Sequence, residues 1–226
     1  MAQLLAEVYR LRLMGGLEDL LRGCGYGRIA GVDEVGRGSL AGPVVAAAVI
    51  VEPGCMVPGV DDSKSISSPK RERLAAAIRR AHPVAAVAAV SPRDIDRMNI
   101  LQATRQAMLQ ALGSLAPAPD LALVDAVRLS EPPFPCLPVI RGDQISYAVA
   151  CASILAKVER DRTMVELDRS YPQYGFASNK GYGAKAHRQA LCDYGPSAVH
   201  RLTFRSVLPQ QKPAALDLQP AAGGGG

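Results

Sequence analysis

The chain has 226 residues, 48% of them hydrophobic, which is enough for one domain with a core of ordinary size. Its 26 basic and 21 acidic residues give a net charge of +5, too small to identify a nucleic-acid-binding protein without further evidence. No apolar run reaches the ~18 residues of a membrane span, and charges interrupt the first apolar run, which excludes a secretory signal. We therefore expect a cytoplasmic protein without membrane contact.

The cysteines are five in number, an odd count, and none are spaced as C-x-x-C: Cys24, Cys55, Cys136, Cys151 and Cys192. This pattern excludes a disulfide framework and a cysteine-based zinc site. We expect reduced, mostly buried thiols.

The predicted elements alternate between helix and strand along the chain. Helices are predicted from apolar spacing and capping residues at about 1–20, 68–80, 92–112 and 144–170, and another begins near 184. Strands are predicted at 28–33, 43–51, 84–90 and 121–125, and a proline-rich loop at 132–138. The low aromatic content alone would favour packed helices, but the alternation indicates a mixed α/β domain.

Acidic residues stand at the edges of three of these segments. Asp33 and Glu34 follow one strand, Asp125 ends another, and Asp143 precedes the long helix. Carboxylates are seldom buried unless they are paired or bound to metal. A cluster of oxygen ligands without histidine or cysteine suits Mg2+ or Mn2+. For any one of these sites alone, a helix cap or a strand end is the simpler interpretation. The three together leave that interpretation and a metal site both open.

A glycine-rich segment follows the first acidic pair. Gly36 and Gly38 would allow the backbone to approach a ligand closely, and Arg37 between them could contact a phosphate. The glycine spacing does not match the G-x-G-x-x-G pattern of dinucleotide-binding proteins. For the glycines alone, a tight turn is the simpler interpretation.

Several segments together match the motifs of a known family. Residues 30–45 read AGVDEVGRGSLAGPVV, 61–64 read DDSK, 141–143 read RGD, 150–157 read ACASILAK, 179–183 read NKGYG and 200–204 read HRLTF. In this order they resemble ribonuclease HII, and the resemblance extends from about residue 4 to residue 207.

The resemblance implies an RNase H-like α/β fold, a mixed five-stranded sheet flanked by helices, with a C-terminal helical part at about 170–207 that grips the substrate. Residues 1–207 would form one catalytic domain and 208–226 a flexible tail. The implied activity is that of a monomeric endonuclease acting on the RNA strand of RNA–DNA hybrids. It would also cut on the 5′ side of single ribonucleotides embedded in duplex DNA. Hydrolysis with two divalent ions, Mn2+ or Mg2+, would leave 3′-hydroxyl and 5′-phosphate ends.

The resemblance also implies roles for individual residues. The four metal-binding carboxylates of the family match Asp33, Glu34, Asp125 and Asp143. Its loop that reads the ribose 2′-hydroxyl matches Gly36, Arg37 and Gly38, and its tyrosine at the RNA–DNA junction matches Tyr182.

Further residues are candidate substrate contacts, each with a structural alternative: Lys64, Ser146, Lys157, Arg160 and Lys180. For Ser146 helix capping is the simpler role, whereas for Lys157 and Arg160 we favour electrostatic contact over a solvated helix face. His187 could line the nucleic-acid groove. Arg201 could contact DNA or anchor the C-terminal part through a salt bridge.

Three positions depart from the family pattern. Ser39 stands where a proline is common, Ala126 where a glycine is frequent, and Ala184 where a threonine often occurs. None replaces a metal ligand, so the departures bear on efficiency rather than on the presence of activity.

Two rival functions are compatible with parts of the sequence. The sister type, ribonuclease HIII, usually carries an additional N-terminal domain, whereas about 27 residues precede the first predicted strand here. A catalytically silent nucleic-acid-binding module is the rival from another class. Four carboxylates argue against it, because they repel phosphate unless metal is present.

Overall fold

A computed structural model describes residues 1–63 and 65–208 of the chain. Lys64 and nearly all of the predicted tail, residues 209–226, lie outside the described residues.

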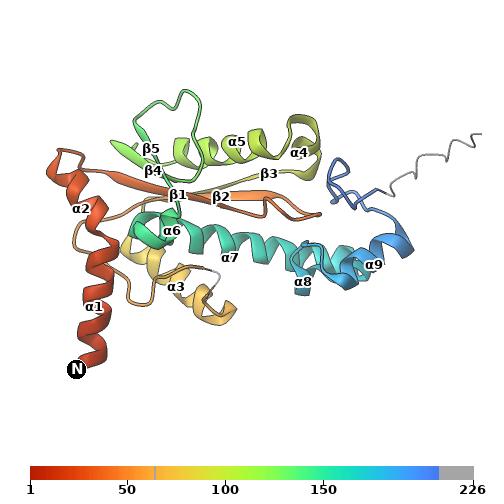
Figure 1. Ribbon diagram of the computed structural model, residues 1–226, viewed down its shortest axis with the longest axis horizontal. Coiled ribbons are helices and arrows are strands. Elements are labelled where there is room, and N and C mark those ends of the chain that lie inside the picture. Colours follow the sequence, from red (N-terminus) through yellow and green to blue (C-terminus); the bar gives the residue numbers. More distant parts are fainter. Residues whose placement is uncertain (64, 209–226) are drawn as a thin grey trace, which may run out of the picture.

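The centre of the molecule is a five-stranded mixed sheet with the strand order β3-β2-β1-β4-β5 (Figure 1). Its strands are β1 (Ile29–Val35), β2 (Val44–Ile50), β3 (Ala85–Val90), β4 (Leu121–Asp125) and β5 (Cys136–Val139). The β1, β2 and β3 strands pair antiparallel, whereas β4 pairs parallel with both β1 and β5. All seven residues of β2 are buried, as expected of a central strand covered on both faces. The mixed five-stranded sheet predicted for the chain is confirmed.

Helices cover both faces of this sheet (Figure 1). One face packs against the long helix α7 (Tyr147–Ser170), with α3 (Ser68–Ala81) beyond it, and the other against α5 (Ile100–Gly113) and the shorter α4 (Pro92–Met98). Because successive strand residues point to opposite faces, alternate residues of β2 enter the two separate cores.

The two ends of the sheet carry smaller helical parts (Figure 1). At one end lie α1 (Ala2–Met14), α2 (Gly16–Gly23) and the single turn α6 (Gly142–Ile145). At the other end the C-terminal part consists of a 3-10 turn (Pro172–Tyr174), α8 (Phe176–Asn179) and α9 (Lys185–Tyr194). Its small core includes Leu40 and Ala41 from the loop after β1, which joins this part to the sheet. The C-terminal helical part predicted at 170–207 is therefore present.

Some predicted boundaries were wrong. The predicted helix at 1–20 breaks at Gly15, and the one at 92–112 breaks at Asn99, whose φ of 71° no helix continues through. The predicted helix at 144–170 is interrupted at Ser146, which is extended and caps α7. The predicted proline-rich loop contains β5, where the edge of the sheet tolerates Pro138.

The cysteines also differ from expectation. All five are free thiols, but only Cys151 is buried, whereas Cys24, Cys55 and Cys192 are exposed. None of the described helices is long and apolar enough to cross a bilayer.

The packing of α7 on the sheet yields a prediction for Gly31 in β1. A Cβ atom at Gly31 would overlap the Ala148 carbonyl group and the Val149 nitrogen of α7. Since backbone atoms cannot move away as a flexible side chain would, we expect Gly31→Ala to destabilise the fold by about 1–3 kcal/mol. Gly113→Ala, with open space around the new methyl group, should be neutral or stabilising by about 0.5 kcal/mol. Urea denaturation of both variants tests this, and equal stability of the two would contradict the close contact.

Candidate metal centre

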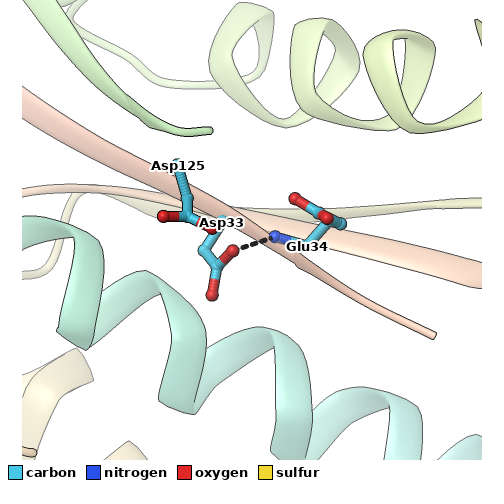
Figure 2. Close-up of side chains that lie close together, drawn as sticks. All are labelled: Asp33, Glu34 and Asp125. Carbon is cyan, nitrogen blue, oxygen red and sulfur yellow. Dashed lines mark hydrogen bonds between the residues drawn. The ribbon is translucent and has the colours of Figure 1, made fainter. Parts of the chain in front are cut away.

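Three of the predicted carboxylates meet at one end of the sheet. Because β1 and β4 are parallel neighbours in which Val32 pairs with Val124, the residues that follow, Asp33 and Asp125, come side by side. Glu34 is the next residue of β1. One carboxylate oxygen from each of these three acidic residues lies within 4.8 Å of the other two (Figure 2).

Only some of the oxygens in this cluster are satisfied by the protein. An Asp33 oxygen accepts from the Glu34 amide at 2.7 Å, and an Asp125 oxygen accepts from the Gly142 amide at 2.7 Å. Arg37 donates to Glu34 Oε1 at 3.1 Å. Glu34 Oε2 is buried and has no hydrogen-bond partner among the described residues. The cluster thus retains acceptor capacity that a bound cation would use.

The electrostatics of the cluster favour positive charge. Burial, with the neighbouring charges of Glu34 and Asp125, raises the pKa of Asp33 well above its usual range. Burial also raises the pKa of Glu34, although Arg37 opposes this shift. A nearby divalent cation would favour the charged forms, and the ligand set consists of oxygen alone. The residues present therefore fit a hard divalent ion such as Mg2+ or Mn2+.

The fourth predicted carboxylate, Asp143, is not a member of this group of three. It is buried in α6, directly after Gly142, whose amide bonds to Asp125. Its oxygens do not belong to the group of three that lie within 4.8 Å. Asp143 stays a predicted ligand.

In the glycine-rich segment after Glu34, packing inside the protein accounts for Gly36. This residue is buried with a φ of 92°, and a Cβ atom there would overlap the Arg160 side chain, which supports the tight-turn interpretation. Gly38 is exposed, and nothing in the protein would obstruct a side chain there. Arg37 is exposed and pairs with Glu34 beside the carboxylate cluster. Gly38 and Arg37 thus remain accessible to a substrate.

Two candidate substrate contacts are buried, and those predictions are corrected. Ser146 accepts from the Val149 amide and donates to Glu18 Oε1 at 2.6 Å, so it caps α7 instead of meeting a phosphate. Arg160 has no exposed surface and donates to backbone carbonyls, so it is neither a phosphate contact nor a solvated helix charge.

The remaining candidates are partly accessible. Lys157 forms an ion pair with Asp161 at 2.6 Å and is largely buried, whereas Lys180 is half-buried and donates to the Ala177 carbonyl. The Tyr182 side chain lies on the surface, with 40% of the residue exposed. Lys64 lies outside the described residues.

Two further residues proved structural. Arg201 is buried and anchors the C-terminal part, as one alternative held, but through the carbonyls of Gly42 and Arg37 and not a salt bridge. Of the two interpretations of His187, the structural one holds and the groove-lining one does not, because its buried ring hydrogen-bonds to His200 and to the Tyr182 carbonyl.

The departures from the family pattern have local consequences that sequence reasoning missed. Ala126, directly after Asp125, has a φ of 44°, a conformation that glycine adopts without strain and alanine does not. Ala184 is the N-cap of α9 and offers it no side-chain hydrogen bond. The buried Ser39 hydroxyl has no hydrogen-bond partner among the described residues. The unusual residue identities were the only signal for these positions.

A mixed five-stranded sheet with helices on both faces, in which Asp33 and Glu34 of β1 converge with Asp125 of β4, is the arrangement expected of a metal-dependent nuclease of the RNase H-like fold. The family model for ribonuclease HII matches residues 30–207. A ribonuclease HII of Geobacter metallireducens is 48% identical over 196 residues, 87% of this chain and 92% of the relative. One from Pelobacter propionicus is 51% identical over 183 residues, 81% of this chain and 84% of the relative. The chain belongs to the ribonuclease HII family, whose members are metal-dependent endonucleases.

Solved structures agree. The ribonuclease H2 of Pyrococcus horikoshii superimposes with a TM-score of 0.67 at 25% identity, covering 80% of this chain and 95% of that one. The RNase HII of Archaeoglobus fulgidus, solved in complex with PCNA, gives a TM-score of 0.66 at 28% identity, covering 82% of this chain and 98% of that one.

The carboxylate cluster predicts the behaviour of Asp33→Asn in metal-free buffer. The raised pKa of Asp33 means that the folded state binds its proton more tightly than the unfolded state. Ionised Asp33 therefore costs stability at neutral pH, and this cost disappears as the pH falls. We expect Asp33→Asn to raise the melting temperature with chelator present, by about 3 °C for each kcal/mol gained. The gain should shrink in acid.

Differential scanning calorimetry across this pH range tests the prediction, with Asp193→Asn on the exposed surface of α9 as the control. A loss of metal-free stability in Asp33→Asn at neutral pH would assign Asp33 a structural role. Added Mn2+ should stabilise the wild type and the control more than Asp33→Asn.

Proposed function

We propose that the protein hydrolyses the RNA strand of RNA–DNA hybrids and cuts on the 5′ side of single ribonucleotides in duplex DNA. The products would carry 3′-hydroxyl and 5′-phosphate ends. The observation that carries the proposal is the convergence of Asp33, Glu34 and Asp125, with Glu34 Oε2 buried and without a hydrogen-bond partner in the described part of the chain. Membership of the ribonuclease HII family supports RNA in hybrids as the substrate class.

In this proposal Asp33, Glu34, Asp125 and Asp143 hold two divalent ions, Mg2+ or Mn2+. When bound, such ions activate a water molecule and stabilise the leaving oxygen of the scissile phosphate. The protein's own contribution is to hold the carboxylates in place before the ions arrive. The Gly142 amide fixes Asp125, and the Glu34 amide fixes Asp33.

The surface beside the cluster would then select the substrate. Only a contact with the 2′-hydroxyl, or with the sugar shape that it imposes, can distinguish RNA from DNA at a given site. We assign the 2′-hydroxyl to the loop at the exposed residues Arg37 and Gly38, and the deoxyribose after the ribonucleotide to the exposed side chain of Tyr182. Lys180, Lys157 and Lys64 would contribute attraction to phosphate. The enzyme would act as a cytoplasmic monomer.

The remaining rival is a module that binds hybrids without cutting them. Such a module would gain nothing from carboxylates that repel phosphate in the absence of metal. The rival predicts binding that metal does not improve.

The proposal is tested by cleavage of an end-labelled RNA–DNA hybrid with Mg2+ or Mn2+ and with chelator. We expect the wild type to cleave only with metal, and Asp125→Asn to lose at least about a hundredfold in rate, because a charged ligand to the ion is removed. Asp193→Asn, which also exchanges one carboxylate for an amide, should cleave as the wild type does. Metal-independent cleavage, or full activity of Asp125→Asn, would refute the proposal.

Recognition of the junction by Tyr182 predicts a selective defect. The ring would pack against the deoxyribose that follows an embedded ribonucleotide, a contact that a continuous hybrid does not offer. Tyr182→Ala should therefore lower cleavage at a single embedded ribonucleotide about tenfold more than cleavage of a hybrid, the loss expected from an aromatic contact worth 1–3 kcal/mol. Tyr194→Ala, which removes another exposed tyrosine of the C-terminal part, is the control. Equal losses on both substrates would leave Tyr182 as a general contact.

A further inference from the structure

Each of the three guanidinium nitrogens of Arg160, in α7, donates a hydrogen bond inside the protein. Nε donates to the Pro43 carbonyl at 3.0 Å, Nη2 to the Ala41 carbonyl at 3.2 Å, and Nη1 to the Lys180 carbonyl at 2.9 Å. The residue has no exposed surface. Burying a cation is costly, and only the planar fork of arginine offers donors in three fixed directions.

These three carbonyls belong to two segments that are far apart in sequence. Ala41 and Pro43 belong to the loop that begins at Gly36 and runs into β2, here called the glycine loop, residues 36–43. Lys180 begins the turn at 180–183 that presents Tyr182, here called the tyrosine turn. The guanidinium carbon also lies 5.5 Å from the centre of the Tyr182 ring, a cation–π contact. One side chain therefore contacts both segments.

The backbones of the two segments are also joined directly. The Leu40 amide donates to the Gly181 carbonyl at 2.8 Å. A Cβ atom at Gly181 would overlap the Ala41 carbonyl, and a Cβ atom at Gly36 would overlap Arg160 itself. Gly36 and Gly181 thus leave room for the contact between the two segments, so the presence of these glycines does not require a substrate to explain it.

We propose that Arg160 is a positioning residue for substrate selection, which joins the glycine loop and the tyrosine turn into one rigid unit. The two substrate contacts would then be held at a fixed spacing, one nucleotide step apart. These are the contact of Arg37–Gly38 with the 2′-hydroxyl and the contact of Tyr182 with the RNA–DNA junction. This inference rests on the substrate roles proposed above for the two segments, but Arg160 itself touches no substrate.

The test compares kcat/KM on a single embedded ribonucleotide with kcat/KM on a hybrid. In Arg160→Lys the fork is lost, and we expect the ratio of the two values to fall at least about tenfold, the scale on which small misplacements affect catalysis. Adding Tyr182→Ala to Arg160→Lys should lower the ratio no further, because each change alone already abolishes the correctly spaced contact of Tyr182 with the RNA–DNA junction. Arg162→Lys, on the exposed side of α7, is the matched control and should keep the wild-type ratio.

A purely structural role gives a different result. If Arg160→Lys lowers the melting temperature but keeps the wild-type ratio, the inference is overturned. If Arg160→Lys does not unfold cooperatively, the uncharged Arg160→Gln replaces it in the same comparison, since it avoids burying an unpaired ammonium group.

A second readout separates this inference from the proposed function. The chain contains no tryptophan, so Tyr182→Trp introduces a single fluorescent reporter on the tyrosine turn. We expect its steady-state anisotropy to fall when Arg160 is also changed to lysine, and not when Arg162 is. If Tyr182→Ala leaves the substrate ratio unchanged, Tyr182 does not recognise the RNA–DNA junction. The anisotropy then shows by itself whether Arg160 holds the tyrosine turn rigid. Unchanged anisotropy in the Arg160→Lys background would overturn the inference.

Discussion

The proposed activity depends on a concentration of negative charge that the fold itself creates. Parallel pairing of β1 with β4 aligns Asp33 with Asp125 at the same end of the sheet, and Glu34 follows directly. Burial and mutual repulsion raise the pKa of Asp33, so the site is electrostatically unfavourable without a cation. The amides of Glu34 and Gly142 hold the carboxylates in place despite this cost. A site that is built in advance of its ions needs little rearrangement when they bind, which is how preorganised sites favour catalysis.

Two buried arginines, Arg160 of α7 and Arg201 of the C-terminal part, hold the glycine loop in place. Arg160 and Arg201 lie beneath the glycine loop with no exposed surface, and both donate to its backbone carbonyls. Burial lowers the pKa of Arg201 to about 9, with nearby Arg160 adding to the shift, so the group stays protonated at neutral pH. The C-terminal part is therefore attached to the sheet through arginine–carbonyl bonds and a small apolar core. On its outer surface Tyr182 is exposed and Lys180 is half-buried, and these are two of the residues proposed above as substrate contacts.

Local patterns in the sequence were sufficient for most elements. They also singled out Asp33, Glu34 and Asp125, but they left both a metal site and ordinary strand ends open, and the resemblance to ribonuclease HII favoured the metal site. Apolar runs identified β1, β2, β3 and β4. In β1, β2 and β4 the runs reflect burial on both faces, whereas the edge strand β3 is apolar but only partly buried. The edge strand β5 carries a half-exposed, proline-containing sequence, so no such run marks it. The break at Ser146 depends on Glu18, 128 residues away. The burial of Arg160 likewise depends on carbonyls up to 119 residues away. An arginine on a helix reads as a surface charge unless those distant partners are known, so tertiary context decided both residues.

The central claim is that Asp33, Glu34 and Asp125 form a divalent-metal site. Its most direct test is titration of the protein with Mn2+, with free Mn2+ measured from its electron paramagnetic resonance signal, in the wild type and in the double variant Asp33→Asn/Asp125→Asn. The account predicts that the wild type depletes the free-ion signal and that the double variant, still folded by circular dichroism, does not. Equal depletion by both proteins would contradict it, because the ions would then bind elsewhere.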